Sequence, residues 1–199
     1  MRHKLTLPGL LALLAFATVP LSGDPPKPNK YIGAEACSSC HKAKVNGDQY
    51  ANWKGTKHAQ AFEVLASDEA KKIAKDRKID DPQKSGECLK CHQTAFDVPA
   101  GDLGPRFDPK QGIQCESCHG AGEKHKSVVV DAPPNLEIVA VPPAETCTGC
   151  HNKNSPSYKP FCYKYFASKI RHLNQKKGRT PEELKAMECQ GGCGVEHGK

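Results

Sequence analysis

The stretch Cys115-Glu116-Ser117-Cys118-His119 shows the spacing that decides the fold: two cysteines three positions apart, followed at once by a histidine. The same C-x-x-C-H spacing occurs at Cys37-Ser38-Ser39-Cys40-His41, Cys88-Leu89-Lys90-Cys91-His92 and Cys147-Thr148-Gly149-Cys150-His151. Two thiols on one helical turn can bond the two vinyl groups on one edge of a haem, and the next histidine then lies under the iron. The sequence therefore predicts four covalently bound c-type haems, with these proximal ligands: His41, His92, His119 and His151.

The amino-acid composition favours a fold built around bound cofactors over one built around a core of apolar side chains. Zinc knuckles and redox-active C-x-x-C pairs share the cysteine spacing, but four repeats that each continue into histidine favour haem. Only 37% of the 199 residues are hydrophobic and 6% aromatic, so the chain needs buried apolar volume from something other than its own side chains. We expect a mainly α fold with short helices and long loops around four closely packed haems, and little or no β structure.

The N-terminus has the layout of a secretory signal peptide. Basic residues at positions 2–4 precede an apolar run over 5–19 that is too short to span a bilayer. We expect a signal peptide over 1–23, with cleavage at 17–23, a tetrahaem domain over 24–176, and a C-terminal helix with a cysteine-containing tail over 177–199. The predicted location is periplasmic or extracellular, with no integral membrane segment in the mature chain.

Four histidines outside the motifs and the signal peptide are candidates for the far side of an iron. His58 shares an apolar helical face with Trp53, and His172 ends an aromatic helical face. His125 follows His119 by six residues, too few to carry it around the ring edge of the same haem, so it should ligate another. His197 lies near the chain end, where frayed residues are more common than ligands.

Longer stretches around these residues resemble the multihaem cytochrome c-554 family. The resemblance runs from about residue 31 to 172 and rests on Trp53…His58-Ala59, Cys88…Thr94, Gly112…His125 and Ser155-Pro156…His172. The family implies four haems in stacked and perpendicular pairs. It also implies that His125 is distal to haem one (His41), His58 to haem three (His119) and His172 to haem four (His151).

Haem two, held by Cys88, Cys91 and His92, has no distal histidine in that pattern. In the family's ammonia-oxidiser cytochrome this haem is five-coordinate, which would leave His92 under an open iron. Three outcomes follow: an open site for a ligand such as nitric oxide, a return of His197 or Met187 onto the iron, or His197 supplied by a second copy. The first would suit a nitric oxide or nitrogen-oxide reductase, and the third a subunit of an extracellular cytochrome filament.

The predicted function is electron transfer between redox partners through a chain of mostly bis-histidine haems, with the two alternatives above kept open. Expected partners are a multihaem oxidoreductase, which the resemblance suggests is of the hydroxylamine oxidoreductase kind, other cytochromes or quinol-linked complexes; a homo-oligomer is a further option. The formal charge of +7 comes from scattered basic residues, so we expect no nucleic-acid partner.

Three cysteines lie outside the motifs. Cys189-Gln190-Gly191-Gly192-Cys193 continues into glycine, so it is not a fifth ordinary haem site. In an oxidising compartment we expect a disulfide from Cys162 to Cys189 or Cys193, with a Cys189–Cys193 pair or an intermolecular bridge as the alternatives. A short helix should precede Cys189 and Cys193, from about residue 180 to 188.

Overall fold

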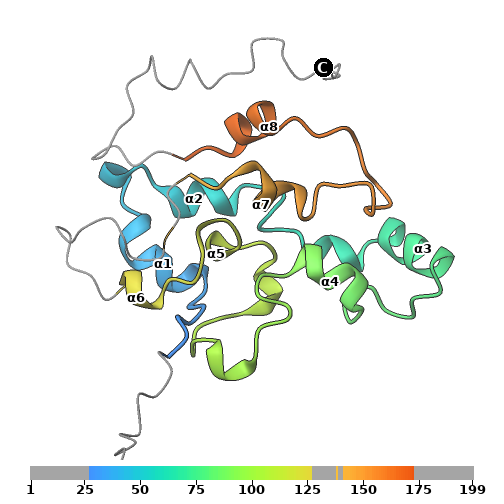
Figure 1. Ribbon diagram of the computed structural model, residues 1–199, viewed down its shortest axis with the longest axis horizontal. Coiled ribbons are helices and arrows are strands. Elements are labelled where there is room, and N and C mark those ends of the chain that lie inside the picture. The colour runs from blue at the N-terminus through green and yellow to red at the C-terminus, as the bar shows by residue number, and fades with distance from the viewer. Residues whose placement is uncertain (1–26, 127–137, 139–140, 173–199) are drawn as a thin grey trace, which may run out of the picture.

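The computed structural model describes residues 27–126, 138 and 141–172. Short helices joined by long loops make up this part of the chain (Figure 1). The α-helices are α1 (Ala34–His41), α2 (Gln49–Lys54), α3 (Asp68–Asp76), α4 (Gly86–His92), α5 (Cys115–His119), α6 (Glu123–Lys126), α7 (Ala144–Thr148) and α8 (Tyr163–Ile170). The 3-10 helices are η1 (Lys44–Asn46), η2 (Glu63–Ala66), η3 (Ala100–Asp102) and η4 (Pro109–Gln111).

No strand occurs among the described residues, where the β structure is one isolated bridge between Tyr31 and Leu103. The expectation of a mainly α fold is therefore confirmed. Nor does this part of the chain contain a helix that is long and apolar enough to cross a membrane. The predicted signal peptide, the tail helix, Met187 and His197 all lie outside the described residues.

Each haem motif forms a helical turn, as its spacing requires. α1, α4 and α5 end on a motif histidine, and the turn of α7 continues to the fourth one, because the His151 N–H donates to the Cys147 carbonyl at 2.9 Å. Since residues three apart lie on the same face of a helix, the two thiols of each motif emerge side by side.

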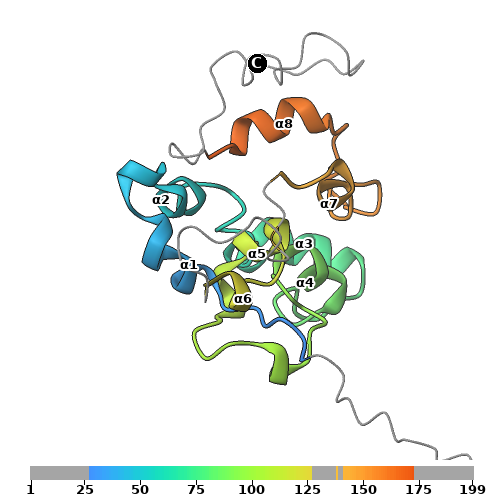
Figure 2. The same cartoon turned by 60° about the vertical axis from the view of Figure 1, so that its left-hand side comes forward.

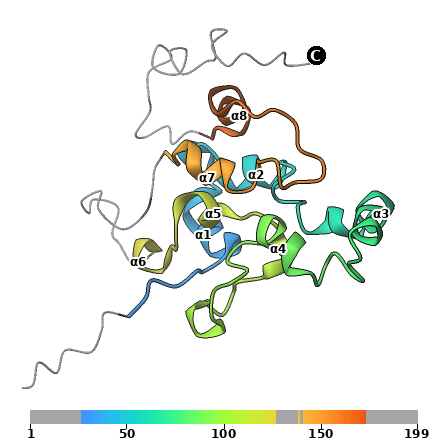
Figure 3. The same cartoon turned by 45° about the vertical axis from the view of Figure 1, so that its right-hand side comes forward.

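The described helices surround a centre rather than form layers. α5 packs against both α1 and α7 and lies near the middle in all three views (Figures 1, 2 and 3). α8 lies on the side of α2 and α7, while α3 and α4 lie towards the end remote from α1 and α6 in Figures 1 and 3. The third motif therefore occupies the centre of this arrangement.

The polypeptide supplies little apolar core of its own. The buried hydrophobic residues of the described chain are mostly alanines: Ala34, Ala36, Ala61, Leu65, Ala74, Leu89 and Cys162. So small a core matches the low hydrophobic content of the sequence and is what a fold organised around bound cofactors would need.

The segment around His58 differs from the single amphipathic helix that the sequence predicts. α2 ends at Lys54, and turns follow Gly55. The Thr56 hydroxyl donates to the Trp53 carbonyl at 2.7 Å, and the His58 carbonyl accepts the Ile113 N–H at 2.9 Å. These bonds replace those that would have continued the helix, so a loop rather than a helix carries His58.

Candidate haem sites

Eight thiols are available for haem attachment. All eight motif cysteines are free, and they lie in four pairs on the four helical turns. Thioether formation needs such a pair of thiols on one turn, followed by a histidine for the iron. The residues present therefore fit c-type haem in number, spacing and chemistry.

Three motif histidines face a second histidine from a distant part of the chain. The ring centroids lie 6.2 Å apart for His41 and His125, 6.0 Å for His58 and His151, and 5.8 Å for His119 and His172. With metal–nitrogen bonds of about 2 Å, two imidazoles on opposite sides of one iron have centroids about 6 Å apart. All three pairs therefore have the separation that bis-histidine ligation requires.

These pairs correct part of the assignment that the family resemblance implied. His125 faces His41, in agreement with it. His58, however, faces His151 of the fourth motif rather than His119 of the third. His172 in turn faces His119 rather than His151.

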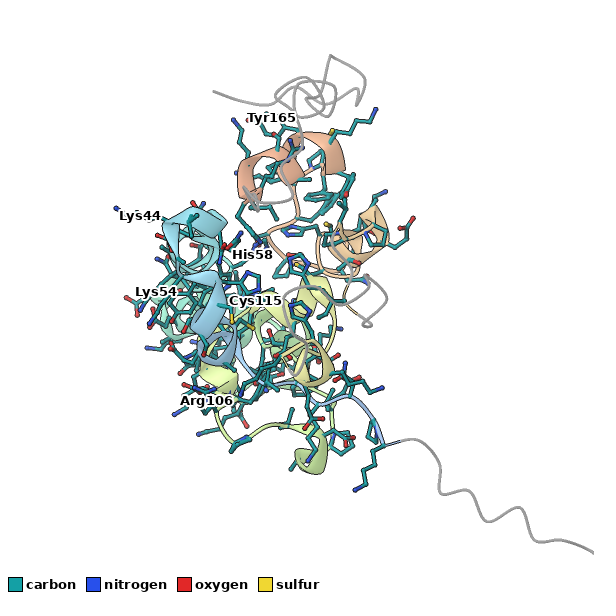
Figure 4. The ribbon with its side chains drawn as sticks, turned by 90° about the vertical axis from the view of Figure 1, so that its left-hand side faces the viewer. Lys44, Lys54, His58, Arg106, Cys115 and Tyr165 are labelled. Carbon is teal, nitrogen blue, oxygen red and sulfur yellow. The ribbon has the colours of Figure 1, made fainter. Side chains whose placement is uncertain are left out.

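The exchange is not evident from the order of the motifs along the chain. The His58 loop is held by its backbone to the segment before α5, through the bond from Ile113. In Figure 4 the His58 ring and the Cys115 thiol both lie towards the interior, whereas Lys44, Lys54 and Arg106 lie at the periphery. Although its loop is bonded to the segment before the third motif, the His58 ring faces His151 of the fourth, and His172, after the end of α8, faces His119 of the third.

His92 of the second motif is oriented by a backbone group. Its Nδ1 lies 2.6 Å from the Ala61 carbonyl oxygen, which can only accept, so Nδ1 carries the proton and Nε2 is left for iron. No histidine ring faces His92 within the described residues. The three outcomes for haem two remain predictions, because Met187 and His197 lie outside that part of the chain.

Burial favours the ligand form of two distal histidines. Burial lowers the pKa of His58, and the neighbouring His151 lowers it further. Burial also lowers the pKa of His172, and the nearby His119 and His41 lower it further, while the hydrogen bond with Ile170 raises it. A lowered pKa keeps imidazole neutral, and neutral imidazole is the form that binds a metal.

Contacts between thiols show which motifs are neighbours. A hydrogen bond with Cys115 raises the pKa of Cys37, and the same bond lowers the pKa of Cys115. Burial raises the pKa of Cys150 to about 12, assisted by the charge of Cys91 and a hydrogen bond with it. Motif one thus adjoins motif three, and motif two adjoins motif four. Since α5 packs on α7, motifs three and four are also neighbours, and these contacts connect the motifs in the order one, three, four, two.

Two buried polar side chains join motif one to motif three. The Glu116 carboxylate accepts the backbone N–H groups of Ile32 and Gly33, both at 2.8 Å. The Gln114 side-chain oxygen accepts the Ala34 N–H, also at 2.8 Å. These bonds satisfy N–H groups at the start of α1, which have no partner within the helix. The sequence reasoning did not identify either residue, because no spacing rule marks a polar side chain beside a haem motif.

Thr94 joins motif two to motif three. It is 1% exposed, its hydroxyl lies 2.7 Å from that of Ser117, and its backbone N–H donates to the Gly112 carbonyl at 3.0 Å. The sequence alone did not show whether Thr94 reaches the distal side of haem two. Its hydroxyl is engaged in this buried network instead.

Of the three cysteines outside the motifs, Cys162 is described. It is 3% exposed and disulfide-bonded, in agreement with the expectation for this residue. Cys189 and Cys193 lie outside the described residues, so the choice between them stays a prediction.

Comparisons with known proteins point to one family. Residues 36–120, which carry the first three motifs, match the family model for cytochrome c554 and c-prime. Cytochrome c-554 of Nitrosomonas europaea is 34% identical over 125 residues, covering 59% of this chain and 49% of the relative, so the match spans about half of the relative's length. The solved structure of reduced cytochrome c554 from the same organism aligns over 78% of this chain and 81% of its own, with 26% identity and a TM-score of 0.43. Residues 36–120 of the chain are therefore similar to the cytochrome c554 and c-prime family.

Proposed function

We propose that the chain is an exported tetrahaem c-type cytochrome that transfers electrons between redox partner proteins, through haems arranged in the order one, three, four, two. The observation that carries the proposal is the set of three opposed histidine pairs, each at the spacing for one iron. The thiol contacts support the order of the haems. The family match supports the electron-carrier class.

At three of the four sites, the residues present suit electron transfer better than catalysis on a substrate bound to the iron. When bound, haem supplies a one-electron iron couple. Two histidines on one iron leave no position for a substrate, and the backbone bonds around His58 hold its loop in place, so ligation should persist in both oxidation states. Adjacent motifs place successive electron-transfer sites next to one another.

Haem content is the first test of this proposal. A pyridine haemochrome assay on the exported protein should give four haems per chain, because each motif offers two free thiols and a histidine. Mass spectrometry of the intact chain should show the mass of four covalent haems. Two or fewer haems per chain would contradict the tetrahaem proposal.

The spin state of haem two tests whether a nitric oxide or nitrogen-oxide reductase is possible at that site. On the family pattern, we expect one high-spin and three low-spin haems by electron paramagnetic resonance. Nitric oxide should then bind one site per chain and remove the high-spin signal. If all four haems are low-spin and nitric oxide does not bind, the reductase alternative is excluded and the carrier remains.

A further inference from the structure

The carboxylate of Glu116 is a buried charge at the junction of motifs one and three. Glu116 is 3% exposed and lies between the two cysteines of the third motif. Oε1 accepts the N–H groups of Ile32 at 2.8 Å and Gly122 at 2.7 Å, and Oε2 accepts that of Gly33 at 2.8 Å. Three donors directed at two oxygens match an ionised carboxylate, which only accepts.

The surroundings hold this charge without neutralising it. Within the described residues, the hydrogen-bond partners of Glu116 are backbone N–H groups rather than lysine or arginine side chains. A backbone N–H carries only a partial charge, and burial removes most of the screening by water. The electric field of the carboxylate therefore extends to its neighbours.

The field of Glu116 reaches the sulfurs of both motifs. The Cys115 hydrogen bond, burial and the nearby Cys115 and Glu116 charges together raise the pKa of Cys37. At Cys115 the hydrogen bond from Cys37 lowers the pKa, while burial and the Glu116 charge oppose that effect. In the holoprotein these two sulfurs would be thioethers on the edges of haems one and three.

We propose that Glu116 sets the reduction potentials of haems one and three together, by placing one buried negative charge at their junction. A negative charge stabilises ferric haem relative to ferrous haem, because the ferric form carries one more positive charge. Glu116 therefore lowers both potentials and makes this pair harder to reduce than it would otherwise be. The inference rests on the proposed tetrahaem function and adds a tuning residue to it.

The test is a redox titration of the holoprotein and its Glu116→Gln variant, with each haem followed by NMR. Haem count and spin state are measured first, so that a failure of the tetrahaem proposal is seen separately. In Glu116→Gln, the ratio of reduced to oxidised haem at fixed applied potential should rise roughly tenfold at haems one and three. This is the effect expected when a unit charge close to an iron is removed and its interaction is partly screened. Haems two and four should change much less.

Three further variants separate charge from structure. Glu116→Asp keeps the charge and should leave the potentials near those of the wild type. Gln114→Ala removes the neighbouring bond to Ala34 without changing charge, and should lower stability without the selective shift. Glu87→Gln removes an exposed acid beside the second motif, and should shift no haem by more than about twofold, because water screens it.

Each alternative outcome overturns the proposal. Equal shifts at all four haems, or no shift in Glu116→Gln, would remove the selective effect of the charge. A shift in Gln114→Ala as large as in Glu116→Gln would assign the effect to packing. If Glu116→Gln does not attach four haems, Glu116→Ala, which places no amide donor against Gly33, takes its place. Failure of both neutral variants to attach haem would assign Glu116 to assembly instead.

Discussion

Replacing His58 with alanine is expected to convert haem four, and no other low-spin haem, to the high-spin state. The His58 ring faces the fourth-motif His151 at 6.0 Å, so its loss removes the sixth ligand of that iron alone. Electron paramagnetic resonance should show one additional high-spin haem per chain. NMR contacts between haem methyl groups and the protons of Cys147 or Cys115 would identify which haem has changed.

This result distinguishes the observed pairing from the one that the family resemblance implied. A change at the haem attached to Cys115 would restore His58 to the third motif and contradict the structure. The His172→Ala variant should show the reverse pattern, with the change at that third haem. Lys57→Ala, an exposed neighbour of His58, is the matched control and should leave all four spectra unchanged.

Replacing Gly112 with alanine should weaken the fold and displace His58 at the same time. Gly112 has φ of +68°, and an added Cβ would lie 2.6 Å from the His58 carbonyl oxygen and 3.0 Å from that of Ala59. The backbone conformation alone should cost about 1–3 kcal/mol with a side chain present. The clash adds to this cost, because it falls on the backbone that carries the distal ligand. Denaturation followed by Soret absorption should show the loss of stability, with some high-spin haem four before unfolding.

Gly101 provides the control for this change. An added Cβ there would meet no atom within 4 Å, and Gly101 lies in an exposed 3-10 turn. Gly101→Ala should therefore change the free energy of unfolding by less than about 0.5 kcal/mol. Equal stability losses at the two glycines would contradict the close packing of Gly112 against the His58 loop.

Local chemistry explains why some features were readable from the sequence and others were not. Attachment cysteines and proximal histidines share one helical turn, so a five-residue window shows them completely. The prediction of a helix around His58 was wrong. The apolar residues there have helical spacing, but the Thr56 hydroxyl binds the Trp53 carbonyl and the Ile113 N–H binds the His58 carbonyl, and the helix ends before His58. Apolar periodicity shows which side of a segment is buried, and it does not show which long-range bonds compete for the backbone.

The pairing of distal histidines could not be read from the chain either. His58 and His172 lie in segments of suitable character, but either could have faced either haem until the contacts of α5 with its neighbours were known. Glu116, Gln114 and Thr94 were missed as functional residues for a similar reason. Their importance comes from partners 18 to 84 residues away, as in the Thr94–Gly112 and Glu116–Ile32 bonds.

The alanine-rich core has a consequence for how the protein matures in the cell. Two buried leucines, each contributing about 1.5–3 kcal/mol, cannot offset the conformational entropy of ordering more than one hundred residues. We therefore expect the chain without haem to be sensitive to proteolysis rather than to persist as a folded apoprotein. We expect haem attachment and folding to be coupled, so that the supply of haem limits how much folded protein accumulates.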